Sequence, residues 1–203
     1  MRFVGNVYNG IETPGFTFVP EMGGYLAFLA RISHEKGALQ AIRIAKASGE
    51  KLVMAGKVDP TDVAYFEERI KPLIDGDQIR FIGEIGHEDK VKLLGHAKAL
   101  LAPIQWDEPF GLYFIEAMAC GTPVIANRRG SVPEVIADGV TGYIVDTVEE
   151  AAAKIADIGD IDRTACRHHV EGRFSDETMT EGYVSVYEAL LNRHRGSLSP
   201  ILS

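Results

Sequence analysis

The chain has 203 residues and carries a formal charge of −8, from 21 lysines and arginines against 29 aspartates and glutamates. Apolar residues make up 46% and charged residues 25%, a globular composition that excludes disordered, collagen-like and coiled-coil chains. The acidic balance argues against nucleic acid as a partner, and the charge-free stretches are too short for a transmembrane segment. With no signal-peptide pattern and only two cysteines in unrelated contexts, the sequence predicts a cytoplasmic domain without a disulfide framework.

The first segment, residues 1–20, differs from the rest of the chain. Asn9-Gly10 and Pro14-Gly15 are turn dipeptides with only short apolar stretches between them, so this segment is predicted to be an interdomain connector. A domain is expected over 21–195, followed by a flexible tail at 196–203. Short apolar runs predict strands at 25–32, 52–55, 78–82, 99–103, 123–126 and 142–145. Amphipathic or capped stretches predict helices at 35–47, 59–74, 88–97, 111–120, after Thr147, and at 175–193.

Short unbroken strands that alternate with amphipathic helices indicate a parallel sheet covered on both faces. The predicted fold class is therefore α/β: a doubly wound, mostly parallel sheet with helices on both faces, of Rossmann-like type. Asp59 and Pro60 are expected to open the second helix, with Asp59 as its cap. In such folds ligands bind outside the carboxyl ends of the strands, so the loops that follow the strands are the places to look for a site.

The loop after the first predicted strand carries two cations, Arg31 and Lys36, shortly before a helix. Fixed positive charge beside the free amides of a helix N-terminus suits a diphosphate group. Gly37 would allow a ligand to approach the backbone closely, because it has no side chain. From spacing alone, an ordinary solvated loop remains the alternative interpretation of this segment.

The loop and helix after the fourth strand hold two carboxylates, Glu108 and Glu116, eight residues apart. Gly111 opens the helix, so the amides of Gly111 and Leu112 would point at a ligand there. Glu116 lies on an otherwise apolar helix, where burying an unpaired carboxylate is costly. Carboxylates are suited to accept hydrogen bonds from sugar hydroxyls. The alternative is a helix-capping Glu108 and a surface Glu116.

Two further loops give weaker signals. The segment 80–84 ends a strand at Gly83, where exposed backbone could meet a planar base. The segment 127–134 also follows a strand and carries two adjacent arginines, Arg128 and Arg129. These arginines are explained more readily by solvent or by contact with a partner than by catalysis, so the segment is not assigned to the site.

The segment Glu108-Pro-Phe-Gly-Leu through Glu116-Ala-Met-Ala-Cys-Gly-Thr-Pro resembles the signature of retaining glycosyltransferases of the group 1 (family 4) type. These are two-domain GT-B enzymes, and the resemblance, over roughly residues 5–190, is to the C-terminal domain that binds the nucleotide-sugar donor. Other motifs agree in order: Arg31-x4-Lys36-Gly37, Phe81-Ile-Gly83, Gly130-Ser-Val-Pro-Glu134, Asp138-Gly-x-Thr-Gly142 and Val7-Tyr-Asn-Gly10-Ile.

The resemblance implies a role for each matched residue. Arg31 and Lys36 would hold the donor diphosphate and stabilise it as the leaving group. Glu108 would bind hydroxyls of the donor sugar, and Glu116 those of the ribose. No metal and no cofactor are expected, because the two cations would take the place of a metal. Backbone contacts to the sugar or distal phosphate, and to the base, would come from Phe110, Gly111 and Leu112, and from Ile82 and Gly83.

An enzyme of this type also needs an N-terminal domain that binds the acceptor, and the chain starts at the interdomain segment. The resemblance therefore implies the donor-binding half of a hexosyltransferase, inactive by itself, that uses a UDP-, GDP- or ADP-sugar. The missing half would belong to a longer protein or to a separate chain. The donor and the acceptor stay open. Alternatives on the same fold are a sugar-nucleotide epimerase, a phosphorylase-type enzyme or a non-catalytic nucleotide-binding module.

Overall fold

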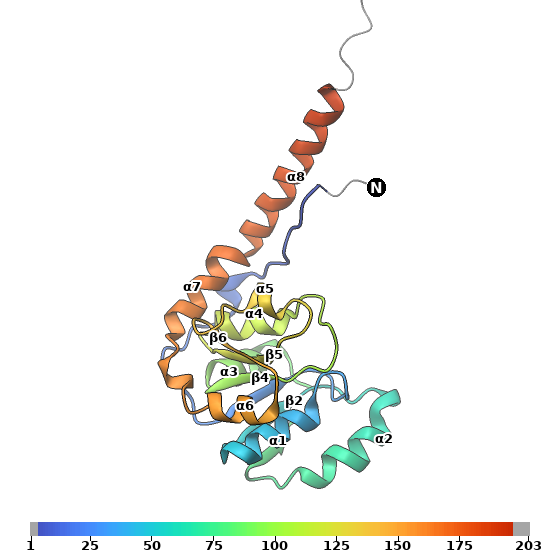
Figure 1. Cartoon of the computed structure of the whole chain (residues 1–203), viewed down its shortest axis with the longest axis vertical. Coiled ribbons are helices and arrows are strands. Elements are labelled where there is room, and N and C mark those ends of the chain that lie inside the picture. Colours follow the sequence, from blue (N-terminus) through green and yellow to red (C-terminus); the bar gives the residue numbers. More distant parts are fainter. Residues whose placement is uncertain (1–3, 197–203) are drawn as a thin grey trace, which may run out of the picture.

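The computed structural model describes residues 4–196 (Figure 1). Residues 1–3 and 197–203 lie outside the described part, and with them most of the tail predicted at 196–203. Helices surround one sheet, and the long helix α8 (Asp176–Gly196) extends away from it beside the N-terminal segment (Figure 1). The predicted α/β fold class is confirmed.

Six parallel strands form the sheet in the order β3-β2-β1-β4-β5-β6. Leu26 of β1 is level with Leu52 of β2 on one side and with Ala99 of β4 on the other. The bounds predicted for β2 and β6 are confirmed, whereas β1 ends earlier than predicted. The strands are β1 (Leu26–Leu29), β2 (Leu52–Ala55), β3 (Ile79–Phe81), β4 (Ala99–Ala102), β5 (Val124–Asn127) and β6 (Gly142–Val145).

Helices cover both faces of the sheet, which explains why its strands are apolar runs rather than alternating patterns. The central strand β4 is buried along its whole length. The chain moves outward from β1 to β3 and then returns to β4, so right-handed crossovers place the connecting helices on opposite faces. Accordingly, α1 packs against α6, while α4 packs against α3 and α7.

The connecting helices follow the predicted alternation. Their bounds are α1 (Ala38–Ser48), α2 (Val63–Tyr65) within a helical stretch at 60–73, α3 (His87–Gly95), α4 (Leu112–Ala119), α5 (Val132–Val135), α6 (Val148–Lys154) and α7 (Arg163–Arg173). α1 begins later than predicted because the Lys36 amide donates to Ser33 Oγ in a turn that precedes the helix. Neither α5 nor α7 is predicted: α5 is about one turn long, and α7 contains few apolar residues among many charged and polar ones, so it shows no apolar run.

Both cysteines, Cys120 and Cys166, are buried free thiols. Burial raises the pKa of each thiol to about 12, so both stay protonated. Both pack in the core as small apolar side chains. In the part of the chain that the structure describes, no helix combines the length and the apolar character that crossing a membrane requires.

The N-terminal segment packs against the C-terminal helices and the core. Ile11 bridges the turn between α7 and α8, donating to the Phe174 carbonyl (2.9 Å) and accepting from the Asp176 amide (3.1 Å). Phe16 is buried in the core. Gly10 cannot carry a side chain, because a Cβ would lie 2.2 Å from backbone of this same turn. The segment is thus fixed to the domain at two points.

Arg163, at the start of α7, ties this segment to the sheet. Its buried guanidinium donates to the carbonyl oxygens of Val19 (2.8 Å), Gly95 (2.8 Å) and Ala97 (3.0 Å) and to Thr122 Oγ1 (2.8 Å). Burial lowers the pKa of Arg163, but these acceptors stabilise the charged form. The sequence gives no signal for this role, because the acceptors come from segments that only the fold brings together.

We expect Arg163→Met to lower the free energy of unfolding by about 3 kcal/mol, because it leaves several buried acceptors without a donor. Urea unfolding followed by circular dichroism measures this loss. Arg69→Met, at an exposed position of the 60–73 helical stretch, is the matched control and should change the value by less than about 0.5 kcal/mol. Equal losses in the two variants would contradict the role assigned to Arg163.

Candidate functional site

The carboxyl ends of β1 and β4 form the switch point of the sheet, because the strand order reverses between these neighbours. β1 leads into the loop that carries Arg31 and Lys36, and β4 leads into the loop that carries Glu108. Since the strands are parallel, both loops emerge at the same edge. The strand order therefore brings together residues that are far apart in the sequence.

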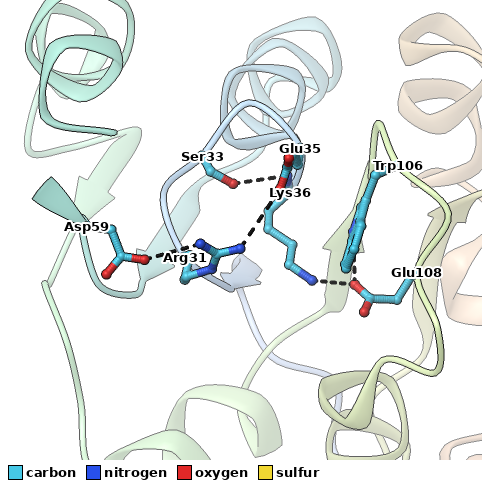
Figure 2. A network of polar contacts seen from close by, with 7 residues as sticks. All are labelled: Arg31, Ser33, Glu35, Lys36, Asp59, Trp106 and Glu108. Carbon is cyan, nitrogen blue, oxygen red and sulfur yellow. Dashed lines mark hydrogen bonds and ion pairs between the residues drawn. The ribbon is translucent and has the colours of Figure 1, made fainter. Parts of the chain in front are cut away.

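An ion pair between Lys36 and Glu108 spans this edge (Figure 2). The Lys36 Nζ donates to Glu108 Oε2, and only 13% and 8% of the two side chains are exposed. Trp106 contributes twice: its Nε1 donates to the same carboxylate oxygen at 3.2 Å, and its ring centroid lies 4.6 Å from the Lys36 Nζ. Because bulk water barely reaches the pair, each charge depends on the other for neutralisation.

Arg31 lies near this pair but contacts other groups (Figure 2). Its guanidinium is half-exposed, 3.2 Å from Asp59 Oδ2 and 3.9 Å from Glu35 Oε2. Asp59 lies at the N-cap position and Pro60 in the first turn, as expected, but the Asp59 side chain makes no capping hydrogen bond, because two cations, Lys57 and Arg31, attract it more strongly. Hydrogen bonds from Lys57 and Arg31 lower the pKa of Asp59. An anion would therefore reach Arg31 by displacing these carboxylates.

Two glycines allow the loops to approach each other. Gly37 caps α1 in the left-handed region (φ 78°), and a Cβ there would lie 2.0 Å from the Pro103 carbonyl oxygen. Gly130 (φ 53°) lies against the backbone of Glu108, whose carbonyl oxygen would be 2.3 Å from a Cβ. The same carbonyl accepts from the Ser131 amide at 2.9 Å. Both glycines are thus required by packing, independently of any ligand.

Glu116 has a partner that the sequence does not indicate. Its carboxylate accepts a hydrogen bond from the Lys90 Nζ at 2.6 Å, across the contact between α4 and α3. Both side chains are mostly buried, and the Lys90 Nζ also lies 5.3 Å from the Phe16 ring centroid. In the sequence Lys90 looks like any lysine on a polar helix face, and only the packing of the two helices brings it to Glu116.

The start of α4 presents the predicted backbone groups. Gly111 caps the helix (φ 80°), and a Cβ there would lie 2.3 Å from the Phe114 ring. Leu112 is largely exposed, whereas Phe110 is buried beside Tyr8. The first amides of a helix have no acceptor within the helix, so those of α4 can serve a ligand. The Phe110 side chain itself acts in packing.

Ile82 and Gly83 lie at the end of β3, which β2 separates from β1. The Ile82 amide donates to the Met54 carbonyl (2.9 Å), and the Gly83 carbonyl accepts from the Gly56 amide (2.8 Å). Within residues 4–196 the Ile82 carbonyl and the Gly83 amide have no backbone partner. Open space adjoins Gly83, and the Ile82 side chain is exposed. One free acceptor and one free donor at an open edge match a planar base.

Tyr113, on the first turn of α4, places a buried hydroxyl beside the Lys36–Glu108 pair. This hydroxyl makes no hydrogen bond within the described chain, and the ring centroid lies 5.6 Å from the Lys36 Nζ. Burial first, and the Glu108 carboxylate second, raise the pKa of Tyr113 well above its usual value, so the hydroxyl keeps its proton. The sequence does not single it out, because an aromatic residue on an apolar helix usually packs in the core.

The candidate site therefore combines two lysine–carboxylate pairs with Arg31, which lies beside two further carboxylates. Among residues 4–196, no group of three or more histidine, cysteine, aspartate or glutamate side chains is placed to hold a metal ion. Lysine and arginine bind phosphate oxygens, and carboxylates accept hydrogen bonds from hydroxyls. The arrangement suits a ligand that carries both phosphates and hydroxyls.

Comparison with known proteins identifies the family. Residues 12–168 match the family model described as glycosyl transferases group 1, and the chain belongs to this family. It is 31% identical, over 172 residues, to an uncharacterized 41.2 kDa protein in the cps region of Klebsiella pneumoniae, covering 81% of this chain and 46% of the relative. It is 30% identical, over 149 residues, to N-acetyl-alpha-D-glucosaminyl L-malate synthase of Bacillus anthracis, covering 70% and 38%. The chain thus spans less than half the length of these relatives.

Solved glycosyltransferase structures share the fold. A glycosyltransferase involved in avilamycin A biosynthesis matches with a TM-score of 0.78 and 28% identity, over 92% of this chain and 57% of that one. Anabaena HepE in complex with UDP and glucose matches with a TM-score of 0.78 and 20% identity, over 90% and 56%. The C-terminal domain of a group 1 glycosyl transferase from Francisella tularensis matches with a TM-score of 0.64 and 24% identity, over 86% and 98%. The resemblance to the C-terminal domain of a GT-B glycosyltransferase is confirmed.

We expect Lys36→Met to lower the free energy of unfolding by about 3 kcal/mol, because it leaves the buried Glu108 carboxylate without its counter-charge. Adding Glu108→Gln should restore most of this loss, since no buried charge is then unpaired. Urea unfolding of the single and double variants measures the coupling. The control Lys71→Met removes an exposed pair with Glu67 and should cost less than about 1 kcal/mol. If the double variant lost as much stability as the two single variants together, the two side chains would not neutralise each other.

Proposed function

We propose that the chain is the donor-binding half of a retaining glycosyltransferase and that it binds a nucleotide-diphosphate sugar. The observation that carries this proposal is the buried Lys36–Glu108 pair at the switch point of the sheet. The Lys36 ammonium group can donate to a diphosphate instead of to Glu108, and a sugar hydroxyl can donate to the Glu108 carboxylate. A nucleotide-diphosphate sugar brings both groups in one molecule, so neither partner is left unpaired when the ion pair separates.

The leaving group in this proposal is the nucleoside diphosphate. When the bond between the anomeric carbon and the phosphate oxygen breaks, the electron pair stays on that oxygen and negative charge grows on the diphosphate. Lys36 and Arg31 stabilise this charge in the place of a metal ion, together with the amides at the start of α4. The acceptor oxygen bonds to the same face of the sugar, which retains the configuration, and its proton passes to the departing diphosphate.

The remaining site residues orient the donor. Glu108 accepts hydrogen bonds from hydroxyls of the sugar and Glu116 from those of the ribose, while the backbone of Ile82 and Gly83 meets the base. The name of the Bacillus anthracis relative and the UDP and glucose bound to Anabaena HepE support a hexosyl donor. UDP is therefore the first nucleotide to test, followed by GDP and ADP.

An acceptor-binding domain completes the enzyme in this proposal. The chain covers 57% of the avilamycin glycosyltransferase chain that it matches, which leaves room for such a domain there. α8 carries an apolar stripe that nothing in the described chain covers: Tyr183, Val184, Tyr187, Leu190 and Leu191. Their spacing places them along one side of the helix, which suits packing against a second domain.

The cytoplasm is the compartment in which we expect this enzyme to work. Cys120 and Cys166 are both buried as free thiols, which fits a reducing compartment. No further cofactor is needed in the proposed reaction, because the donor sugar is already activated by its diphosphate and the cations of the site neutralise the leaving group.

We expect calorimetric titration to detect binding of a UDP-, GDP- or ADP-sugar, with the same affinity in EDTA and in Mg²⁺. Lys36→Met should weaken binding at least about tenfold, because it removes a charge-assisted contact to phosphate. Glu116→Gln should weaken it about fivefold through the ribose. Arg69→Gln, which removes an exposed arginine outside the site in the 60–73 helical stretch, is the control and should bind normally. Flat titrations with all three nucleotide sugars would contradict the donor-binding proposal.

Transfer itself should require the acceptor-binding domain. Joined to that domain, the chain should release free nucleotide from the donor and give a product with the donor's anomeric configuration, as read by NMR. The chain alone should release none. An isomerised donor without released nucleotide would indicate an epimerase instead, and release that depends on inorganic phosphate would indicate a phosphorylase-type enzyme. If the joined protein catalysed no reaction, a non-catalytic nucleotide-binding module would be the remaining interpretation.

A further inference from the structure

A cavity separate from the Lys36–Glu108 pair opens at the carboxyl edge of the sheet. It has a volume of about 550 Å³, within the roughly 300–1,000 Å³ of small-molecule sites. Its walls come from α1 and from the loops after β4, β5 and β6. Lys36, Glu108 and Glu116 do not line it. We call it the arginine cavity after three of its lining residues, Arg43, Arg128 and Arg129.

Three guanidinium groups gather here on a chain whose formal charge is −8. Arg128 approaches Asp146 only at 4.0 Å, with both side chains more than half exposed. Within the described residues Arg43 and Arg129 make no ion pair. All three arginines are exposed, so a ligand can reach them from solvent. Guanidinium groups bind phosphate with two parallel hydrogen bonds, so three of them around one cavity form a phosphate-binding arrangement.

The polar groups between the arginines accept hydrogen bonds. Gln40 Oε1 has no partner within the described chain, and the last side-chain torsion of glutamine is soft enough to turn this oxygen toward a ligand. Asn127 uses its amide nitrogen on the Ile104 carbonyl (3.3 Å), which leaves its oxygen for another donor. Asp107 and Asp146 also line the cavity. Hydroxyl groups are the donors that this set of oxygens would match.

The loop between β4 and α4 separates this cavity from the Lys36–Glu108 pair. Gln105 and Asp107 line the arginine cavity, whereas the alternate residues Trp106 and Glu108 contact Lys36. Neighbouring residues of this loop thus serve different places. The two places can therefore hold two ligands at once.

We infer that the arginine cavity binds a phosphorylated sugar, with the phosphate on Arg43, Arg128 and Arg129 and the hydroxyls on the neighbouring oxygens. A free phosphate would leave those oxygens unmatched, and an unphosphorylated sugar would leave the arginines unmatched. The inference does not rest on the proposed donor site, because it uses none of that site's residues.

Titration calorimetry at low salt tests this with a hexose 6-phosphate, inorganic phosphate and the free hexose. The hexose phosphate should bind most tightly and the free hexose least. Arg43→Gln and Arg129→Gln should each weaken the hexose phosphate about tenfold, whereas the exposed Arg69→Gln should not. Gln40→Leu should weaken the hexose phosphate about fivefold and leave inorganic phosphate unchanged, because it removes only a hydroxyl contact. Circular dichroism checks that each variant is folded.

Two results would overturn the inference. One is a hexose phosphate that binds no better than inorganic phosphate, or equally well in the Arg69→Gln, Arg43→Gln and Arg129→Gln variants. The other is displacement of the hexose phosphate by UDP, which would assign it to the Lys36–Glu108 site. Retained binding in Lys36→Met would support a separate cavity. Hexose phosphate binding without nucleotide binding would overturn the proposed function and leave this inference standing.

Discussion

The ion pair between Lys36 and Glu108 is the interaction on which the carboxyl edge of the sheet depends. Its partners are 72 residues apart and meet because β1 and β4 are neighbours. Two close backbone approaches hold it in place, at Gly37 and at Gly130, where no other residue fits without strain. A buried ion pair stabilises a fold less well than apolar packing of the same volume, because both charges lose their water. A role in binding accounts for this pair better than a role in folding.

The site is close to electrically neutral before any ligand arrives. Lys36 is matched by Glu108, and Lys90 by Glu116, in pairs that are mostly buried. A bare anion that took Lys36 would leave Glu108 buried without a counter-charge, which is costly. A ligand with both phosphates and hydroxyls gives Lys36 a phosphate and Glu108 a hydroxyl, so neither side chain is left without a partner. Neutral pairing therefore favours a ligand that carries both phosphates and hydroxyls, which is the chemistry of the donor that we propose.

How much the sequence predicts depends on how local each feature is. The strands β2 and β6 were predictable to the residue because apolar runs closed by turns need no information from elsewhere in the chain. At Asp59 the position of the cap was predicted correctly but its hydrogen bond was not, because local rules do not include the two cations that the fold brings to it. Lys90 and Arg163 were missed for the same reason: their partners lie on other elements. The motif residues were found, but their pairing required the strand order.

The loop between β4 and α4 contacts both the Lys36–Glu108 site and the arginine cavity. Its Gln105 amide donates to the Glu35 carbonyl at 2.7 Å, next to Lys36, and its Ile104 carbonyl accepts from Asn127 in the wall of the arginine cavity. The same short segment thus carries Glu108 and holds Asn127 in place. Because its backbone groups are engaged on both sides, the loop keeps the two sites at a fixed separation. The residues that divide the two sites are therefore also the residues that position a side chain in each of them.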